Sequence, residues 1–487
     1  MRKAFSNQLR LDCQSIEELS LNLNCRDQII PLLAGLKYAY KHDGLRTEMI
    51  RLVAADINKE SRTDTGRVGF DYWQIIVLAV IRLGCNVDYD RLQDLCENHF
   101  SLRCILGVGQ WEGTSFAARR IRDTLALIQP DTIASLNRLL VSHGHQLDEN
   151  AATKVRADSF VVETNIHYPT ESRLIWDGMR KIIPLCQVIA SSIQAVGWRQ
   201  AEHLQKKAKA LAREIARISA SKSPHVKKGL NPAYAELITH ARMILERAER
   251  LKMAGETCAN GEIKLIAQCE ELAGWIKLTL QVCDTAYRRT QLGEHVPNTE
   301  KLFSLFETHT QLYRRGKAGQ PTQFGRLVLV YEDRIGFISH YYLMGRTETD
   351  SDTVCAQTRQ AQETHGNRIA ECSFDRGFFS KENEQELKKI VANPCLPATH
   401  RNQYSAQMKT ATVEFHAARQ RHPGIESAIG ALQSGNGLKR CRDKSEKGFE
   451  RYLGFAILGR NFHVLGKLLI ARKDTELIAG KSKRKAA

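Results

Sequence analysis

The chain has 487 residues, of which 43% are hydrophobic and 26% are charged. These shares are ordinary for a folded globular protein, so they exclude a wholly disordered or collagen-like chain, and the length predicts about two to four domains. The formal net charge of +17 favours a polyanionic partner, most often nucleic acid, over a merely solvated basic surface.

The thirteen cysteines are scattered and include no Cys-x-x-Cys pair. This usage indicates neither a disulfide framework nor a zinc site and fits a reducing compartment. The N-terminal stretch MRKAFSNQLR has no apolar core of a signal peptide, and the apolar run IIVLAVIRLG is too short to span a bilayer. We therefore expect a soluble protein of the cytoplasm, associated with the nucleoid if it binds DNA.

Residues 1–150 predict an all-α N-terminal DNA-binding domain of short helices, with starts at Asp71 and Asp88. Gly113-Thr114-Ser115 resembles an N-cap for the next helix, FAARRIRDTLALI, and a further helix is expected over about 131–142. Arg119, Arg120 and Arg122 lie in the first two turns of FAARRIRDTLALI. We expect these arginines to bind DNA, with a solvated basic face as the alternative.

Residues 151–180 change character and predict the first part of an α/β core. KVRADSFVVETNI (154–166) has the β-branched composition of a strand, and RLIWDG (173–178) is interpreted as a second strand. Residues 181–320 then predict long charged helices that form an insertion, which could bind DNA, mediate dimerisation or act as a spacer. RRGKAGQP (314–321) is interpreted as a linker.

Residues 321–470 predict the remainder of the core. GRLVLVYEDRIGFISHYYLMG (325–345) is typical of two strands with a turn near Glu332-Asp333, and a helix capped by Asp350 or Ser351 follows. NRIAECSF (367–374) predicts a strand that runs directly into Asp375, and FFSKENEQELKKIV predicts the next helix. Strands that alternate with helices indicate an α/β architecture.

The C-terminal residues 437–487 are strongly basic. The cations expected to follow a phosphate backbone are Lys439, Arg440, Arg442, Lys444 and Lys447. Residues 471–487 form a basic tail, of which the last eight residues, GKSKRKAA, are expected to be disordered.

Three acids could carry chemistry: Asp158 in the first strand, Asp375 at a strand end and Glu426 in the helix that Pro423 is expected to begin. Each alone could equally be a capping or turn residue. Together, carboxylates from two strands and a helix suit two divalent cations that clamp the attacking and leaving oxygens of a phosphodiester. Glu414, Glu446 and Glu450 are rivals for the role of Glu426.

Four segments resemble bacterial insertion-sequence transposases of the DDE type, closest to the ISNCY group. They are YWQIIVLAVIRLGCNVDYDRLQDLCENHFSLRCILGV, VRADSFVVETNIHYPTESRLIWDGMR, SFDRGFFSKEN and RHPGIESAIGALQSGNGLKRCRDKSEKGFERYLGFAILGRN, in that order along the chain. The resemblance implies an RNase H-like catalytic core with Asp158, Asp375 and Glu426 as its metal-binding triad. It also implies two Mg²⁺ ions (with Mn²⁺ as a substitute), double-stranded DNA from element ends and target, and a homo-oligomer in the synaptic complex.

The chain departs from the family pattern near Glu426. Gln433 stands where related enzymes often have Lys or Arg, and Arg419 and His422 stand where Tyr and Arg can precede the Glu. Arg421 or Lys439 could supply the phosphate clamp instead. Two other interpretations stay open: an RNase H-like nuclease without strand transfer, and a non-catalytic DNA-binding protein derived from a transposase.

Overall fold

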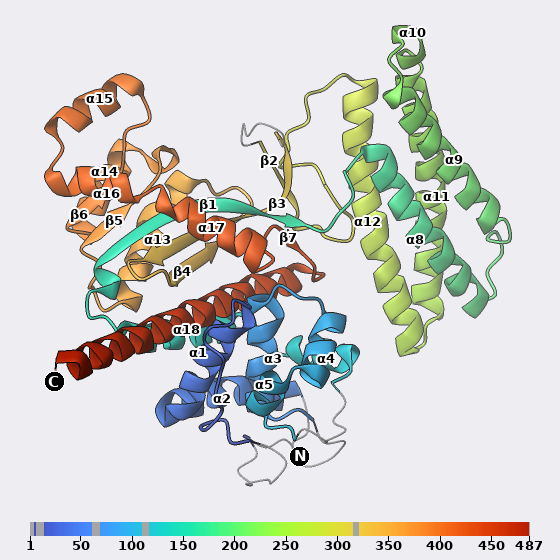
Figure 1. Ribbon diagram of the computed structural model, residues 1–487. Helices are drawn as coiled ribbons and strands as arrows, with labels where there is room; N and C mark the ends of the chain where they lie inside the picture. The colour runs from blue at the N-terminus through green and yellow to red at the C-terminus, as the bar shows by residue number, and fades with distance from the viewer. Residues whose placement is uncertain (1–3, 6–13, 61–68, 110–115, 315–320, 487) are drawn as a thin grey trace. The chain divides into compact units, whose positions relative to one another are not determined.

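The protein divides into two compact units. The computed structural model describes residues 4–5, 14–60, 69–109, 116–314 and 321–486, with the side chains of residues 60 and 474–486 left out. Unit 1 combines residues 1–163 with residues 327–487, and unit 2 is the continuous segment 164–326 (Figure 1). Unit 2 is therefore an insertion, as predicted, but it begins at residue 164 and ends at 326 where we expected 181 and 320.

A mixed sheet of seven strands forms the α/β part of the chain. Its path is β2-β3-β1-β5-β6, with β4 paired to β3 and β7 paired to β1. The strands are β1 (Lys154–Thr164), β2 (Gln311–Tyr313), β3 (Gln323–Asp333), β4 (Ile338–Leu343), β5 (Glu371–Ser373), β6 (Asn393–Cys395) and β7 (Arg440–Cys441). β1 runs parallel to β5 and β5 parallel to β6, whereas β3 is antiparallel to β2 and β4. The predicted α/β class is confirmed at this level.

The parallel strands are joined by helices. α13 (Asp350–Thr364) precedes β5, α14 (Lys381–Ile390) precedes β6, and α15 (Arg401–Thr410), α16 (Val413–Arg421) and α17 (Gly424–Gly435) follow β6. α13 has Thr349 as its N-cap, one residue before the predicted caps, because the Asp352 side chain completes a capping box with Thr349. Pro423 is the N-cap of α17 and not its first helical residue.

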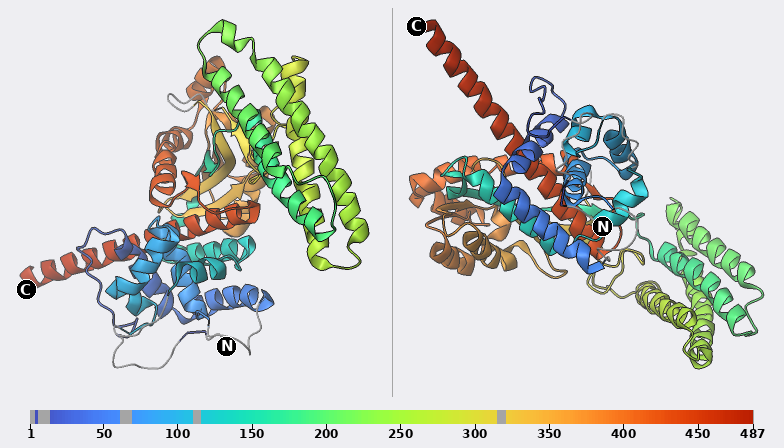
Figure 2. Two further views of the ribbon diagram at one scale, coloured as in Figure 1. Left: turned by 90° about the vertical axis from the view of Figure 1, so that its right-hand side faces the viewer. Right: turned by 90° about the horizontal axis from the view of Figure 1, so that it is seen from below.

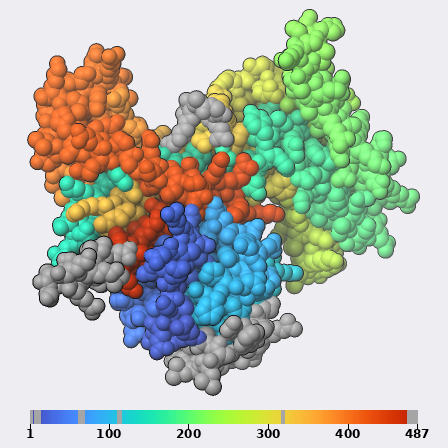
Figure 3. Space-filling model, viewed as in Figure 1, coloured from blue at the N-terminus to red at the C-terminus, as the bar shows by residue number. Residues whose placement is uncertain are grey.

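The N-terminal helices share a hydrophobic core with the sheet and with the C-terminal helix α18 (Glu446–Ala486). These helices are α1 (Ile29–Lys41), α2 (Asp43–Glu60), α3 (Tyr72–Gly84), α4 (Tyr89–Asn98), α5 (Phe100–Ile105), α6 (Ala118–Leu125) and α7 (Pro130–His145). α18 packs against α1, α3 and α7, and Figure 2 shows it running beside them. In the space-filling view the blue and cyan atoms of this part adjoin the red atoms without a break (Figure 3). Residues 1–150, predicted as a domain of their own, belong to unit 1 together with the C-terminal part of the chain.

Glycines let α18 approach its neighbours closely. A Cβ on Gly459 would collide with the backbone of Gly84 in α3, and a Cβ on Gly466 would collide with the backbone of Pro31 in α1. Residues Glu446–Lys473 of α18 are long and apolar enough, by length and composition, to cross a membrane, but 67% of the apolar window is buried inside the protein. Such burial is typical of a core helix. The helix continues through Ala486, so the expectation of a disordered C-terminus is wrong.

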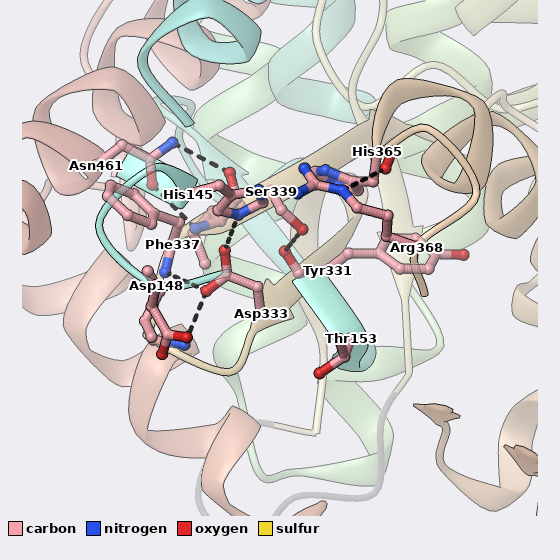
Figure 4. A network of polar contacts seen from close by, with 12 residues as sticks. His145, Asp148, Thr153, Tyr331, Asp333, Phe337, Ser339, His365, Arg368 and Asn461 are labelled. Atoms are coloured by element: carbon pink, nitrogen blue, oxygen red, sulfur yellow. Dashed lines mark hydrogen bonds and ion pairs between the residues drawn. The ribbon is translucent and has the colours of Figure 1, made fainter. Parts of the chain in front are cut away.

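A buried polar network fixes the β3–β4 turn within unit 1 (Figure 4). Asp333 accepts hydrogen bonds from the backbone N–H groups of Ile335 and Phe337, at 3.1 and 2.9 Å, and lies 2.8 Å from His145 Nε2 in α7. Asn461 of α18 accepts from the N–H of Ile338 at 2.9 Å. The strand thus extends through Asp333 before it turns, one or two residues beyond the predicted turn.

Unit 2 is built on four long helices and the short helix α10 (Pro224–Lys227). The long helices are α8 (Glu171–Ser192), α9 (Ala201–Ala220), α11 (Leu230–Cys258) and α12 (Ile263–Gln291), which lie side by side in both views of Figure 2. They enclose a hydrophobic core of their own.

The prediction of a strand over RLIWDG is wrong, because this segment is the start of α8. Thr170 caps the helix, and Leu174, Ile175, Gly178 and Met179 follow at helical spacing on its buried side. The predicted N-cap at 113–115 and most of the linker at 314–321 lie outside the described residues. α6 begins at Ala118, after Ala117.

Candidate functional site

Asp158 and Asp375 lie on adjacent parallel strands. The register pairs Lys154 with Glu371 and Arg156 with Ser373; continued by two residues, past the end of β5, it would set Asp158 opposite Asp375. Asp375 keeps an extended backbone just after β5 (φ −83°, ψ 169°). Neighbouring strands are about 4.8 Å apart, and side chains at alternate positions share a face. The two carboxylates therefore belong to the polar face of the sheet that carries Arg156 and Ser373.

The α16–α17 junction covers the same face. Arg156 Nη1 donates to the carbonyl oxygen of Arg421 at 3.0 Å, and a Cβ on Gly424 would collide with the Arg156 guanidinium. His422 Nδ1 lies 3.2 Å from Ser373 Oγ. Glu426 follows in the first turn of α17, with an exposed side chain. The junction thus places the Glu426 helix beside the two aspartate-bearing strands.

Charged side chains line a hollow of about 460 Å³ on this face. Arg156 Nε donates to Glu332 Oε2 at 2.6 Å, Arg421 pairs with Glu371, and Lys154 Nζ lies 3.7 Å from Glu371 Oε2. Burial raises the pKa of Glu332, and the Arg156 guanidinium opposes that shift. Arg156 and Arg421 therefore offset the negative charge of the buried acids Glu332 and Glu371.

His422, at the α16–α17 junction, is buried. Burial and then the nearby charge of Arg419 lower its pKa to about 4, while the Asp375 carboxylate acts in the opposite direction. At neutral pH the imidazole therefore carries no charge, and it supports the start of α17 by packing and hydrogen bonding.

The triad is not assembled as a closed metal site. Among the described residues, no three His, Cys, Asp or Glu side chains form a group that could hold a metal ion. The structure places Asp158 in β1 and Asp375 after the neighbouring β5, and the junction before the helix of Glu426 contacts Arg156 and Ser373 of these strands. Of the rivals, Glu414 is exposed in the first turn of α16, and Glu446 begins α18.

The basic residues of the β7–α18 segment form one exposed stretch. All five predicted cations there have exposed side chains: Lys439, Arg440, Arg442, Lys444 and Lys447. Arg440 pairs with Glu163 at the end of β1 at 3.1 Å, and Arg442 Nη2 donates to Asn86 Oδ1 at 2.8 Å.

A buried ion pair holds this basic stretch in place. Arg82 of α3 donates two hydrogen bonds to the carboxylate of Asp443, at 2.9 and 2.5 Å, and its guanidinium stacks over the Tyr89 ring at 3.9 Å. Arg82 is 2% exposed. The segment is therefore anchored on the N-terminal helices and presents its cations outward.

The α6 arginines lie on the surface. Arg119 and Arg122 both approach Asp123, at 3.6 and 3.2 Å, and the Arg120 guanidinium lies 4.5 Å from the Phe70 ring centroid. Asp123 offsets part of their charge.

Sequence reasoning missed three members of the hollow: Arg156, Glu332 and Glu371. The signal for Arg156 was present, because Lys154, Arg156 and Asp158 alternate with Val155 and Ala157 along the strand. Glu332 was assigned to a turn, and Glu371 was hidden inside an apolar strand. Neither position carries a local sign of its ion pair.

No protein-family model, no curated protein and no solved structure matches this chain.

Proposed function

We propose that the chain is a DDE-type DNA transposase that uses divalent cations to cleave and join phosphodiesters at the ends of an insertion sequence. The observation that carries the proposal is the parallel pairing of β1, which contains Asp158, with β5, which ends two residues before Asp375. Asp375 follows the carboxyl end of β5, where ligands of α/β sheets bind, and paired carboxylates suit phosphoryl chemistry.

The sheet supports an RNase H-like interpretation of the core. Its first strand lies in the middle of the sheet, with the parallel strands β5 and β6 on one side and the antiparallel β3–β4 pair on the other. The two aspartates then come from the first strand and from the end of its parallel neighbour, and the glutamate comes from a later helix.

The donor chemistry fits divalent cations. Asp158, Asp375 and Glu426 offer hard carboxylate oxygens, which Mg²⁺ and Mn²⁺ prefer, and these residues would hold the ions. Bound ions supply charge neutralisation at the attacking and leaving oxygens. Arg156 and Arg421 keep the neighbouring acids Glu332 and Glu371 paired, so that these do not compete for the cations.

The β7–α18 cations would hold the DNA. Each Lys or Arg that neutralises a phosphate contributes to affinity and makes binding weaker as salt rises. The Arg82–Asp443 pair fixes this segment to the body of unit 1, which is what a surface needs to position a DNA backbone over a reaction site.

DNA on both sides of the reading frame supplies the test substrate. We expect terminal inverted repeats there, and we expect the wild-type protein with Mg²⁺ or Mn²⁺ to nick a plasmid that carries them. Asp375→Asn should lower the nicking rate by about a thousand-fold, because such a site contributes several kcal/mol to the transition state. Glu363→Gln, which changes an exposed acid of α13, should cleave like the wild type.

The products separate the competing functions. Nicked and joined strands support a transposase, whereas nicks without joining indicate a nuclease. DNA binding without metal-dependent cleavage in the wild type would contradict the catalytic proposal and favour a non-catalytic DNA-binding protein. Equal nicking by wild type and Asp375→Asn would exclude this triad.

A further inference from the structure

Unit 2 contains a surface hollow of about 520 Å³ between α8, α9 and the segment that leads into α8. This volume lies in the range of small-molecule and nucleotide sites. Its lining combines cations and aromatic rings, and every residue of it belongs to unit 2.

The cations of the hollow outnumber its acids. Arg173, Arg180, Lys209 and Arg213 line it. The acid among the lining residues is Asp177, which is 9% exposed and already paired with Arg180 Nε at 2.8 Å. The side chains of Arg173, Lys209 and Arg213 are exposed. The hollow is therefore complementary to a phosphate group and not to a cation.

Two aromatic rings accompany these cations. Tyr168 is 72% exposed. Its ring meets the Phe324 ring in a T-shaped contact, with centroids 5.5 Å apart and an interplanar angle of 86°, so the two rings do not stack face to face. Trp176 is half-buried, and Lys209 Nζ lies 5.9 Å from its ring centroid. Aromatic faces beside a basic groove are what single-stranded nucleic acid requires, because bases stack on the rings while cations hold the backbone. Bases of an intact duplex are stacked on one another and cannot enter such a hollow without leaving the helix.

We propose that this hollow binds an unpaired nucleotide of a DNA strand, with its phosphate on Arg213, Lys209 and Arg173 and its base against Tyr168 or Trp176. The choice of DNA rests on the proposed function of the chain. The preference for an unpaired strand rests on the aromatic rings and cations of unit 2 alone.

The test measures binding of the full-length protein to a fluorescein-labelled oligothymidine of about 12 nucleotides, a length within the usual site size, and to a blunt duplex of the same length. We expect Trp176→Ala to weaken single-strand binding about tenfold and to leave duplex binding unchanged, and Trp176→Phe to restore it. Arg213→Ala should lower the slope of log affinity against log salt by about 0.7. Arg250→Ala, which removes an exposed cation of α11 outside the hollow, is the matched control and should bind like the wild type.

Three results would overturn the proposal: unchanged single-strand affinity in Trp176→Ala, an equal loss for duplex, or competition by an acidic peptide as strong as by the oligonucleotide. These results are independent of catalysis. If the wild type does not cleave DNA but Trp176→Ala still weakens single-strand binding, the transposase proposal fails and the single-strand site remains.

Discussion

The two units are built in different ways. Unit 2 is one continuous segment, and its core comes from helices that follow one another directly in the chain. Unit 1 draws its core from both ends of the chain: α18 packs on α1, α3 and α7, and β1 pairs with β5 more than 200 residues later. Contacts of that range must overcome the entropy of closing long loops. The candidate catalytic face therefore belongs to the unit whose contacting segments lie furthest apart in the sequence.

The insertion point explains how the two units coexist in one chain. The chain leaves the sheet at the end of β1 and returns first in β2 and then in β3, the strand next to β1. An insertion whose ends lie on adjacent strands leaves the rest of the sheet intact, because loop ends that are close together tolerate extra chain. Asp158 lies six residues before this point, so the insertion does not interrupt the part of β1 that carries it.

The largest stability effect is expected in unit 1, at the buried Asp333. Asp333→Ala removes acceptors from the N–H groups of Ile335 and Phe337 and from His145, and it should lower the free energy of unfolding by about 3 kcal/mol. Hydrogen exchange read by mass spectrometry should show lost protection in α7, β3 and β4 and unchanged protection in α8–α12. Asp131→Ala, an exposed acid in the first turn of α7, should change little. Equal loss of protection in both units would contradict their independence.

A smaller effect is expected in unit 2, at Gly178. A Cβ at this position would collide with the buried Thr279 side chain of α12, so Gly178→Ala should destabilise the helical bundle by about 1–3 kcal/mol. Gly274 lies in α12 with open space around it. Gly274→Ala should therefore stabilise the helix by about 0.8–1 kcal/mol.

Thermal unfolding and hydrogen exchange distinguish these glycine variants from those of unit 1. Protection should change in unit 2 alone and with opposite signs for the two substitutions. A destabilising Gly274→Ala, or a Gly178→Ala without effect, would contradict the packing described for α8 and α12.

Local patterns predicted much of the fold. The strand over 154–166, the two strands within 325–345 and the helices of α13 and α14 are confirmed because each has a clear period or cap. RLIWDG was misassigned because a short apolar run does not distinguish a strand from the buried side of a helix. The cap at Thr170 and the apolar positions further along α8 decide in favour of the helix.

The packing between segments that are distant in the sequence could not be predicted from local sequence patterns. The basic residues around 439–447 favoured an exposed, DNA-binding interpretation of the C-terminal segment. The same segment forms a core helix, in which four apolar residues are buried: Phe449, Phe455, Ile457 and Phe462. The shared core of the N-terminal helices and α18 depends on contacts that no local pattern encodes. For the candidate site, the sequence predicted the three acids, and the structure added the level register of β1 and β5 and the arginine-paired hollow beside them.

The most direct test of the central claim is metal uptake by the carboxylate face of unit 1. Mn²⁺ titrated into the protein and followed by electron paramagnetic resonance reports bound ions without need of a DNA substrate. We expect the wild type and Glu363→Gln to bind Mn²⁺ alike and Asp158→Asn to lose this binding, because a carboxylate oxygen is replaced by a neutral amide. Equal Mn²⁺ binding by the wild type and Asp158→Asn would contradict the assignment of this face as the metal site.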